Sequence, residues 1–304
     1  HLSLRRQRQM CIRDSLNRGM KQKTIGIIQN YYKYSPAYGG IFYAWFSSMH
    51  TRTDIVLCGH QSKKQFLVVV NEIYERLCHI EKLGNCYDTS SELARLNQMA
   101  AIYPQTVSDE LYNILAFCMD YNTRTNGLFD VTVHSADYTS DTILGVQLFP
   151  ESHMLFLQHP GININLSGFL KGYALENIRG ILQFYGVQDA LVNMGNSSVL
   201  ALGKPPLTDG WKVGFGQDVV PQKEKQEILL QNECLTVSGN NSFKRKHIIT
   251  PNSGKLVEGK WAVAVVTKSG TVGEVLSTAL FAADDSQWGL LETEFCPRLV
   301  LKVV

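Results

Sequence analysis

The sequence has no long apolar run, no cysteine pair with C-x-x-C spacing and an overall charge balance that gives no basic stripe. A membrane-spanning helix needs about 20 consecutive apolar residues, so we expect no transmembrane segment. The seven cysteines are scattered, which argues against a zinc knuckle or a dense disulfide framework. With 18% charged residues and a net charge of +2, the composition does not support nucleic-acid binding.

Hydrophobic residues are plentiful: they make up 44% of the 304 residues, enough for a packed core. Residues 1–15 contain four arginines and no apolar stretch typical of a secretory leader. The string at residues 2–15 looks like translated sequencing-adapter sequence, and Met20 is a plausible start. We therefore expect residues 1–19 to be a non-native or disordered leader and residues 20–304 to form one domain.

Helices and strands alternate along the chain without internal repeats. Apolar residues recur at helical spacing from Phe66 to Ile80, Ser108 is placed to cap a second helix, and a third is predicted over residues 168–185. Strands are predicted at residues 49–58, 190–194, 199–202, 211–215, 228–230, 247–249, 261–266 and 299–304. Because hairpins outnumber βαβ units in the second half, we predict an α+β fold with a mixed, largely antiparallel sheet and packed helices.

Two oxygen-bearing side chains near the C-terminus, Glu274 and Thr278, lie one helical turn apart in segment 273–281. They therefore share one helix face, and hard cations favour such a pair of oxygen ligands. An alternative is a capping box between Thr271 and Glu274, in which the carboxylate only closes the start of the helix.

Four upstream segments stand in a characteristic order: Ser-Glu-Leu-Ala-Arg-Leu-Asn at 91–97, Gly-Leu-Phe-Asp-Val-Thr-Val at 127–133, Asn-Leu-Ser-Gly-Phe-Leu-Lys-Gly-Tyr-Ala at 165–174, and His-Ile-Ile-Thr-Pro-Asn-Ser-Gly at 247–254. Together with the segment around Glu274, they resemble the conserved blocks of the ApbE family, the FAD:protein FMN transferases. The resemblance extends from about Met49 to the end of the chain.

This resemblance implies a single compact ApbE-like domain and a transfer reaction with FAD as donor. A Ser or Thr hydroxyl of an acceptor protein attacks the FMN phosphorus, and AMP leaves. It also implies Mg²⁺ held by the Gly168 carbonyl, Glu274 and Thr278. The acceptor would be a transient partner, and nothing in the sequence indicates its identity or the oligomeric state. Many relatives are periplasmic lipoproteins, whereas the thiols favour the cytoplasm, so both locations stay open.

The resemblance assigns further residues to FAD. Met49 and Tyr87 match positions that border the flavin, and Leu128, Phe129 and Asp130 match the adenine side. Asn165, Lys171 and His247 complete the set of expected FAD-binding residues, with His247 also the candidate catalytic residue.

The residues taken by themselves leave other interpretations open. Lys171 fits a solvated helix lysine, and Met49 and Tyr87 fit core positions. Segment 127–133 fits a turn that leads into a strand, and His247 fits a hydrogen-bonded structural histidine.

Five polar positions depart from the family pattern: Asn165, Asn196, Asn240, Thr250 and Glu274. Glu274 replaces an aspartate and is one methylene longer, and Thr250 replaces an aspartate that could orient His247. Three functions follow from this combination. The first is a divergent FAD:protein FMN transferase that uses magnesium; the others are an FAD pyrophosphatase and a flavin-binding pseudoenzyme with weakened catalysis.

Overall fold

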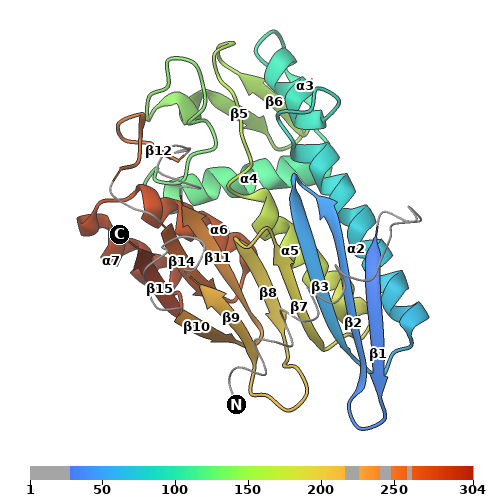
Figure 1. Ribbon diagram of the computed structural model, residues 1–304. Helices are drawn as coiled ribbons and strands as arrows, with labels where there is room; N and C mark the ends of the chain where they lie inside the picture. The colour runs from blue at the N-terminus through green and yellow to red at the C-terminus, as the bar shows by residue number, and fades with distance from the viewer. Residues whose placement is uncertain (1–27, 216–225, 240–247, 259–261, 304) are drawn as a thin grey trace.

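The architecture is a broad antiparallel sheet with helices packed on one face. The computed structural model describes residues 28–215, 226–239, 248–258 and 262–303 (Figure 1). Among these residues the main sheet has eight strands in the order β1-β2-β3-β7-β8-β11-β14-β15, and every pair is antiparallel. The predicted α+β class is confirmed. The leader, residues 1–19, lies outside the described residues.

The strands of the main sheet are β1 (Gln29–Ser35), β2 (Gly39–Ser48), β3 (Thr51–Gly59), β7 (Asp189–Met194), β8 (Ser198–Leu202), β11 (Glu233–Gly239), β14 (Ala262–Thr267) and β15 (Leu299–Val303). Smaller sheets contain β4 (Gln105–Thr106), β5 (Val146–Phe149), β6 (Met154–Leu157), β9 (Trp211–Phe215), β10 (Gln226–Leu230), β12 (Ile249–Thr250) and β13 (Lys255–Leu256).

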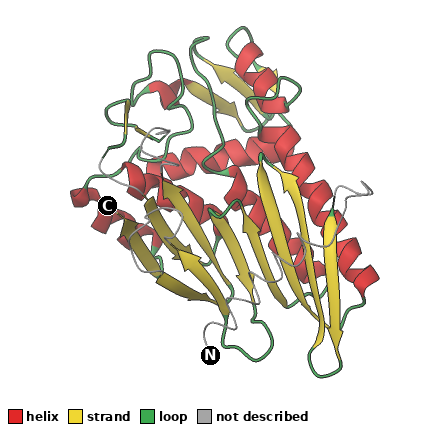
Figure 2. Ribbon diagram, in the orientation of Figure 1, coloured by secondary structure: helices red, strands yellow, loops and turns green. Residues whose placement is uncertain are grey.

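The described helices are α2 (Lys63–Gly84), α3 (Glu92–Met99), α4 (Asp109–Arg124), α5 (Leu170–Phe184), α6 (Gly270–Ala282) and α7 (Asp285–Phe295), with one 3₁₀ turn, η1 (Thr142–Gly145). Figure 2 shows α2, α5 and α6 behind the sheet and the β9–β10 hairpin in front of it. None of the described helices combines the length and apolar character that a membrane crossing requires.

The first predicted helix corresponds to α2, and its apolar face is the core face. Phe66, Val70, Ile73, Leu77 and Ile80 are all completely buried, as the helical spacing predicts. A capping box begins the helix, because the Ser62 side chain accepts a hydrogen bond from the Gln65 N–H and Gln65 in turn accepts one from the Ser62 N–H. Ser108 caps α4 as predicted.

The aromatic segment before β3 forms a hairpin, which the sequence did not indicate. Phe42 and Phe46 on β2 point into the helix-covered core, where Phe42 stacks on Phe66 at 5.7 Å between ring centroids. Tyr31 on β1 and Ile41 on β2 are about 40% exposed. The segment therefore supplies core on one face of the sheet and solvent-exposed surface on the other, because side chains alternate along a strand.

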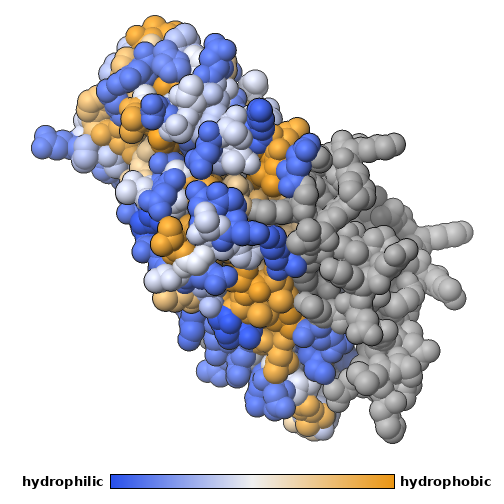
Figure 3. Space-filling view, turned by 90° about the vertical axis from the view of Figure 1, so that its left-hand side faces the viewer, coloured by the Kyte–Doolittle hydropathy of each residue, from blue (hydrophilic) through white to orange (hydrophobic). Residues whose placement is uncertain are grey.

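Two separate apolar clusters pack on opposite faces of the sheet. The larger one joins the sheet to α2, α4, α5 and α6, and the smaller one, which includes Trp211 and Val266, lies beneath the β9–β10 hairpin. Figure 3 views the molecule from the side of α7 and β15, and hydrophilic side chains lie above, below and to the left of a hydrophobic area in the lower half. All six cysteines in the described part of the chain are free thiols.

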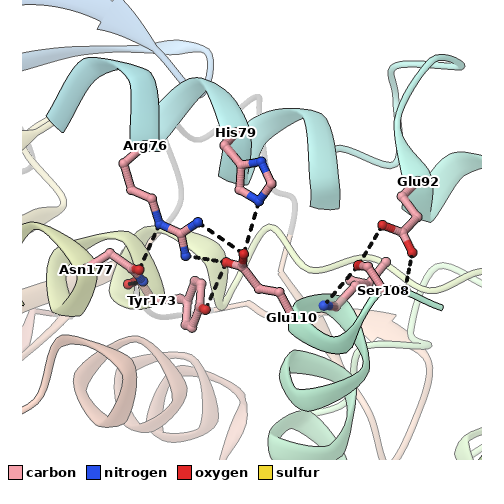
Figure 4. Close-up of polar contacts among 8 residues, drawn as sticks. Arg76, His79, Glu92, Ser108, Glu110, Tyr173 and Asn177 are labelled. Carbon is pink, nitrogen blue, oxygen red and sulfur yellow. Dashed lines mark hydrogen bonds and ion pairs between the residues drawn. The ribbon is translucent and has the colours of Figure 1, made fainter. Parts of the chain in front are cut away.

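A network of charged and polar side chains joins three helices outside the sheet (Figure 4). Arg76 of α2 donates two hydrogen bonds to the Glu110 carboxylate on α4, and it donates a third, 2.9 Å long, to Asn177 of α5. Glu110 also accepts from the Tyr173 hydroxyl at 2.9 Å, and His79 Nε2 lies 3.0 Å from its other oxygen. Burial alone would raise the pKa of the Glu110 carboxyl, but the hydrogen bonds from Arg76 and Tyr173 outweigh burial and lower it.

Replacing Glu110 with glutamine is expected to lower the free energy of unfolding by about 1–2 kcal/mol at pH 7, because the charge-assisted bonds are lost from a partly exposed site. The pKa of Glu110 is lowered in the folded state, so its contribution is present above the pKa of the unfolded chain and disappears as the pH falls through the folded value. Urea denaturation should therefore show a smaller difference in the free energy of unfolding between wild type and Glu110→Gln near pH 4 than at pH 7. Glu75→Gln, an exposed change on α2, is the control and should leave the free energy of unfolding unaltered at both pH values. A loss of stability in Glu110→Gln that is as large near pH 4 as at pH 7 would contradict this account.

Candidate functional site

A cavity of about 340 Å³ lies at the end of the sheet where β8 begins and β11 ends. We call it the main cavity. It lies between the start of α5, the middle of α6, the segment around Asp130 and the residues that enter β12. The predicted site residues that line it are Leu128, Phe129, Asp130, Asn165, Gly168, Lys171, Glu274 and Thr278.

Glu274 reaches this cavity from α6, which begins after Ser269. The Ser269 side chain accepts the Val272 N–H and is the N-cap, so the capping-box interpretation of Glu274 is wrong. The Glu274 side chain is only 4% exposed. Its carboxylate accepts a hydrogen bond from the Ser198 hydroxyl, and the Lys171 ammonium lies 3.9 Å away.

Burial raises the pKa of the Glu274 carboxyl above its usual range, and the Lys171 charge and the Ser198 hydrogen bond only partly offset that effect. A nearby cation would favour the ionised form. Lys171 also donates to the Ser197 hydroxyl and is 25% exposed, so it is not a solvated helix lysine. Residues from α5, α6 and the start of β8 therefore form one polar group.

Thr278 lies one turn after Glu274, and its hydroxyl is 3.1 Å from the Ser238 hydroxyl at the end of β11. Gly168 lies opposite: a methyl group at its Cα would be 3.7 Å from Thr278 Oγ1. Among the described residues, no hydrogen bond to the Gly168 carbonyl is found. An unpaired carbonyl, a hydroxyl and a buried carboxylate thus border one cavity, and this is a donor set that a hard cation could use.

The start of α5 also borders the main cavity. Its N-cap residue, Phe169, provides no side-chain hydrogen bond, and the Leu170 N–H donates to the Leu166 carbonyl at 3.0 Å. The Asn165 Oδ1 accepts from the N–H and the hydroxyl of Ser167, and its Nδ2 donates to the Tyr87 hydroxyl at 3.0 Å. A helix start with a lysine in its first turn suits an anionic ligand.

A second cavity of about 520 Å³ adjoins the first, and we call it the side cavity. Met49, Tyr87 and Leu170 line it, while Asn165 and Lys171 line both cavities. Tyr87 is 74% exposed, so the interpretation of this residue as core is wrong. Met49 is partly buried and precedes β3, which begins at Thr51 instead of residue 49.

The Asp130 segment forms a series of turns and not the strand that one interpretation predicted. The Asp130 carboxylate accepts hydrogen bonds from the N–H and the hydroxyl of Thr132, and from the Tyr138 hydroxyl at 2.8 Å. The Val131 carbonyl accepts the Asn165 N–H at 2.8 Å. The two sequence blocks around Asp130 and Asn165 are therefore joined directly.

The predicted catalytic residue, His247, and the altered position Asn240 lie outside the described residues. Ile248 and Ile249, which follow His247, line the main cavity. Sequence reasoning did not identify Ser197, Ser198 or Tyr138 as site residues. The two serines directly follow a turn at Gly195-Asn196, where both residues have positive φ.

The chain matches the model of the ApbE family over residues 49–295. It belongs to the ApbE family. The FAD:protein FMN transferases of Chlamydia muridarum and Vibrio cholerae are each 25% identical to it, over 262 and 265 residues. These alignments cover 75% and 77% of this chain and 79% and 78% of the relatives. The solved flavin transferase ApbE from Vibrio cholerae has a similar fold, with a TM-score of 0.74 at 19% identity, over 91% of this chain and 94% of that one.

Proposed function

We propose that this ApbE-family protein transfers FMN from FAD to a Ser or Thr hydroxyl of an acceptor protein and releases AMP, with magnesium as the metal. The observation that carries the proposal is the meeting of Lys171 on α5 with Glu274 and Thr278 on α6 at one cavity that continues into a second, more apolar one. The names of the curated relatives support the same activity.

The two cavities suit the two ends of FAD. The side cavity, with Met49, Tyr87 and Leu170, suits the flat flavin ring, whereas the main cavity beside Phe129 and Asp130 suits the nucleotide end. Lys171 lines both cavities, and this supports a role for its ammonium in binding the pyrophosphate between them.

Magnesium fits the oxygen donors at the main cavity. It binds few protein ligands and completes its shell with waters and phosphate oxygens, so the Gly168 carbonyl, Glu274 and Thr278 would suffice to hold it. The described residues contain no group of three or more His, Cys, Asp or Glu side chains that could hold a metal by themselves. When bound, magnesium would neutralise charge on the pyrophosphate.

The transfer forms one P–O bond and breaks another. The acceptor hydroxyl oxygen attacks the phosphorus of the FMN half, and the bond from that phosphorus to the bridging oxygen breaks, so AMP leaves with that oxygen. Lys171 and the first turn of α5 would orient the phosphate oxygens, and the apolar side cavity would exclude water from the flavin. The hydroxyl proton passes to a base, for which His247 is our candidate.

The assay combines the purified chain with FAD, MgCl₂ and an acceptor protein that carries a Ser/Thr-Gly-Ala-Thr type motif. Fluorescent covalent flavin on a denaturing gel, with an equal amount of AMP, is the expected result. AMP without labelled protein would indicate hydrolysis of FAD, and tight FAD binding with neither product would indicate a pseudoenzyme.

Replacing Lys171 with methionine in this assay should lower kcat/KM for FAD about 100-fold, because a charge that contacts the transferring phosphate is lost. Lys64→Met provides the control, since Lys64 is exposed on the first turn of α2. A Lys171→Met enzyme that labels the acceptor as fast as the Lys64→Met enzyme would remove Lys171 from the proposed machinery.

A further inference from the structure

The turn between β2 and β3 has an unusual backbone for its sequence. Ser48 pairs with Thr51, so only Met49 and His50 form the loop, and their φ angles are 49° and 56°. Two-residue loops with two positive φ angles favour Asn and Gly, because a Cβ atom crowds the backbone in this region. A Met-His loop therefore needs support from the surrounding structure, and strained backbone of this kind is concentrated at functional sites.

Helix α2 supplies that support through Glu81, which lies in its last turn. One carboxylate oxygen accepts the Met49 N–H at 2.7 Å, and the other lies 3.6 Å from His50 Nε2. The same ring nitrogen lies 2.9 Å from the Asn85 Nδ2, just past the end of α2. One acidic side chain thus contacts both residues of the strained turn.

The turn and its support lie at the side cavity. Met49, His50, Glu81 and Asn85 all line it, and Lys171 borders it where it meets the main cavity. Met49 also packs against the large apolar cluster. A change in the turn would therefore move the Met49 side chain at the wall of the cavity while the polar group around Glu274 stays in place.

We propose that Glu81 is a positioning residue: it holds the Met49-His50 turn in its strained conformation, so that the Met49 side chain forms one wall of the subsite for the flavin ring. The ligand part of this inference rests on the proposed function. Without the carboxylate, the Met49 N–H loses its acceptor and the turn relaxes to a conformation with less strain. The Met49 side chain then moves away from the subsite for the flavin ring.

Binding of the two halves of FAD tests the proposal. Glu81→Ala should weaken riboflavin binding, measured by quenching of flavin fluorescence, by about tenfold. The reason is that the charge-assisted hydrogen bond from the Met49 N–H to Glu81, which holds the turn, is lost. AMP binding, measured by calorimetry, should stay within about twofold, whereas a general loss of folding would weaken both ligands alike. Glu81→Gln keeps an acceptor for the Met49 N–H and should bind riboflavin much more tightly than Glu81→Ala.

A double variant tests the role of strain. Glycine adopts positive φ without a steric cost, so adding His50→Gly to Glu81→Ala should restore most of the riboflavin affinity. If the double variant binds riboflavin no better than Glu81→Ala, Glu81 does not act by holding the strained turn, and the proposal is overturned.

Hydrogen exchange of the Met49 amide tests the positioning role without any ligand. Glu81→Ala should make this amide exchange at least about tenfold faster, while Ile55 in the middle of β3 stays protected. Unchanged exchange at Met49 would overturn the inference and leave the transferase proposal standing. Failure of the wild-type protein to bind riboflavin or FAD would instead refute the proposed function, and with it the flavin subsite.

Discussion

Replacing Glu274 with glutamine is expected to reduce FMN transfer by about 100- to 1,000-fold, because the substitution removes the carboxylate that α6 places at the main cavity. The measurement is the rate of AMP release in a single turnover with saturating FAD and MgCl₂. Glu292→Gln, an exposed change on α7, is the matched control and should react at the wild-type rate. A Glu274→Gln enzyme as fast as this control would exclude Glu274 as a metal ligand in the reaction.

The same substitution should leave the metal-free fold intact or more stable. Burial raises the pKa of Glu274 in the folded state, so its contribution to stability is fully present below the unfolded pKa and declines as the pH rises through the folded value. Glutamine has no such decline, so metal-free Glu274→Gln should gain stability relative to wild type as the pH rises from 4 to 8. Urea denaturation across this range separates the loss of activity from any loss of folding.

The second large effect is expected at Gly172, where α5 and α6 touch. A methyl group at this position would overlap the Gly270 backbone and lie 2.8 Å from Glu274 Cγ, so Gly172→Ala must push the two helices apart. We expect it to lower the free energy of unfolding by about 2–4 kcal/mol, because backbone atoms at the contact cannot move aside as a flexible side chain would. Since Lys171 and Glu274 lie on these two helices, transfer should fall as well.

Gly180, on the same helix, provides the control. A methyl group there would meet no atom within 4 Å, so Gly180→Ala should raise stability by about 0.5–1 kcal/mol through better helix propensity. Urea denaturation of both variants gives the comparison. If Gly172→Ala were as stable as Gly180→Ala, α5 and α6 could not lie as close together at Gly172 as they do in the structure.

The local patterns in the sequence were reliable where a helix or turn depends on neighbouring residues. The spacing of Phe66, Leu77 and Ile80 marked the buried face of α2, and Ser108 marked the start of α4. Gly186, with a φ of 68°, lies just after residue 185, where the third helix is predicted to end. Strand β11, by contrast, was missed, although it is an interior strand of the sheet and pairs with both β8 and β14. Its residues are buried on both faces and have no alternating pattern.

Glu274 shows where sequence reasoning fails at the site. Its position three residues after Thr271 fits a capping box, yet Ser269 is the cap, and the carboxylate contacts Ser198, 76 residues away in the chain. Likewise, the strand predicted from residue 49 begins two residues later, because Glu81 of α2 holds Met49 and His50 in a turn.

The sequence by itself determined the α+β class, the family and the blocks from which the site is built, because helical periodicity, turn residues and motifs are all encoded in residues close together along the chain. Only the tertiary structure decided that Lys171 faces Glu274 and Ser197, that Asn165 contacts Tyr87, and that Glu81 supports the strained turn. These contacts depend on how the sheet and helices pack. Packing joins residues that are distant in sequence, and local propensity contains no information about such pairs.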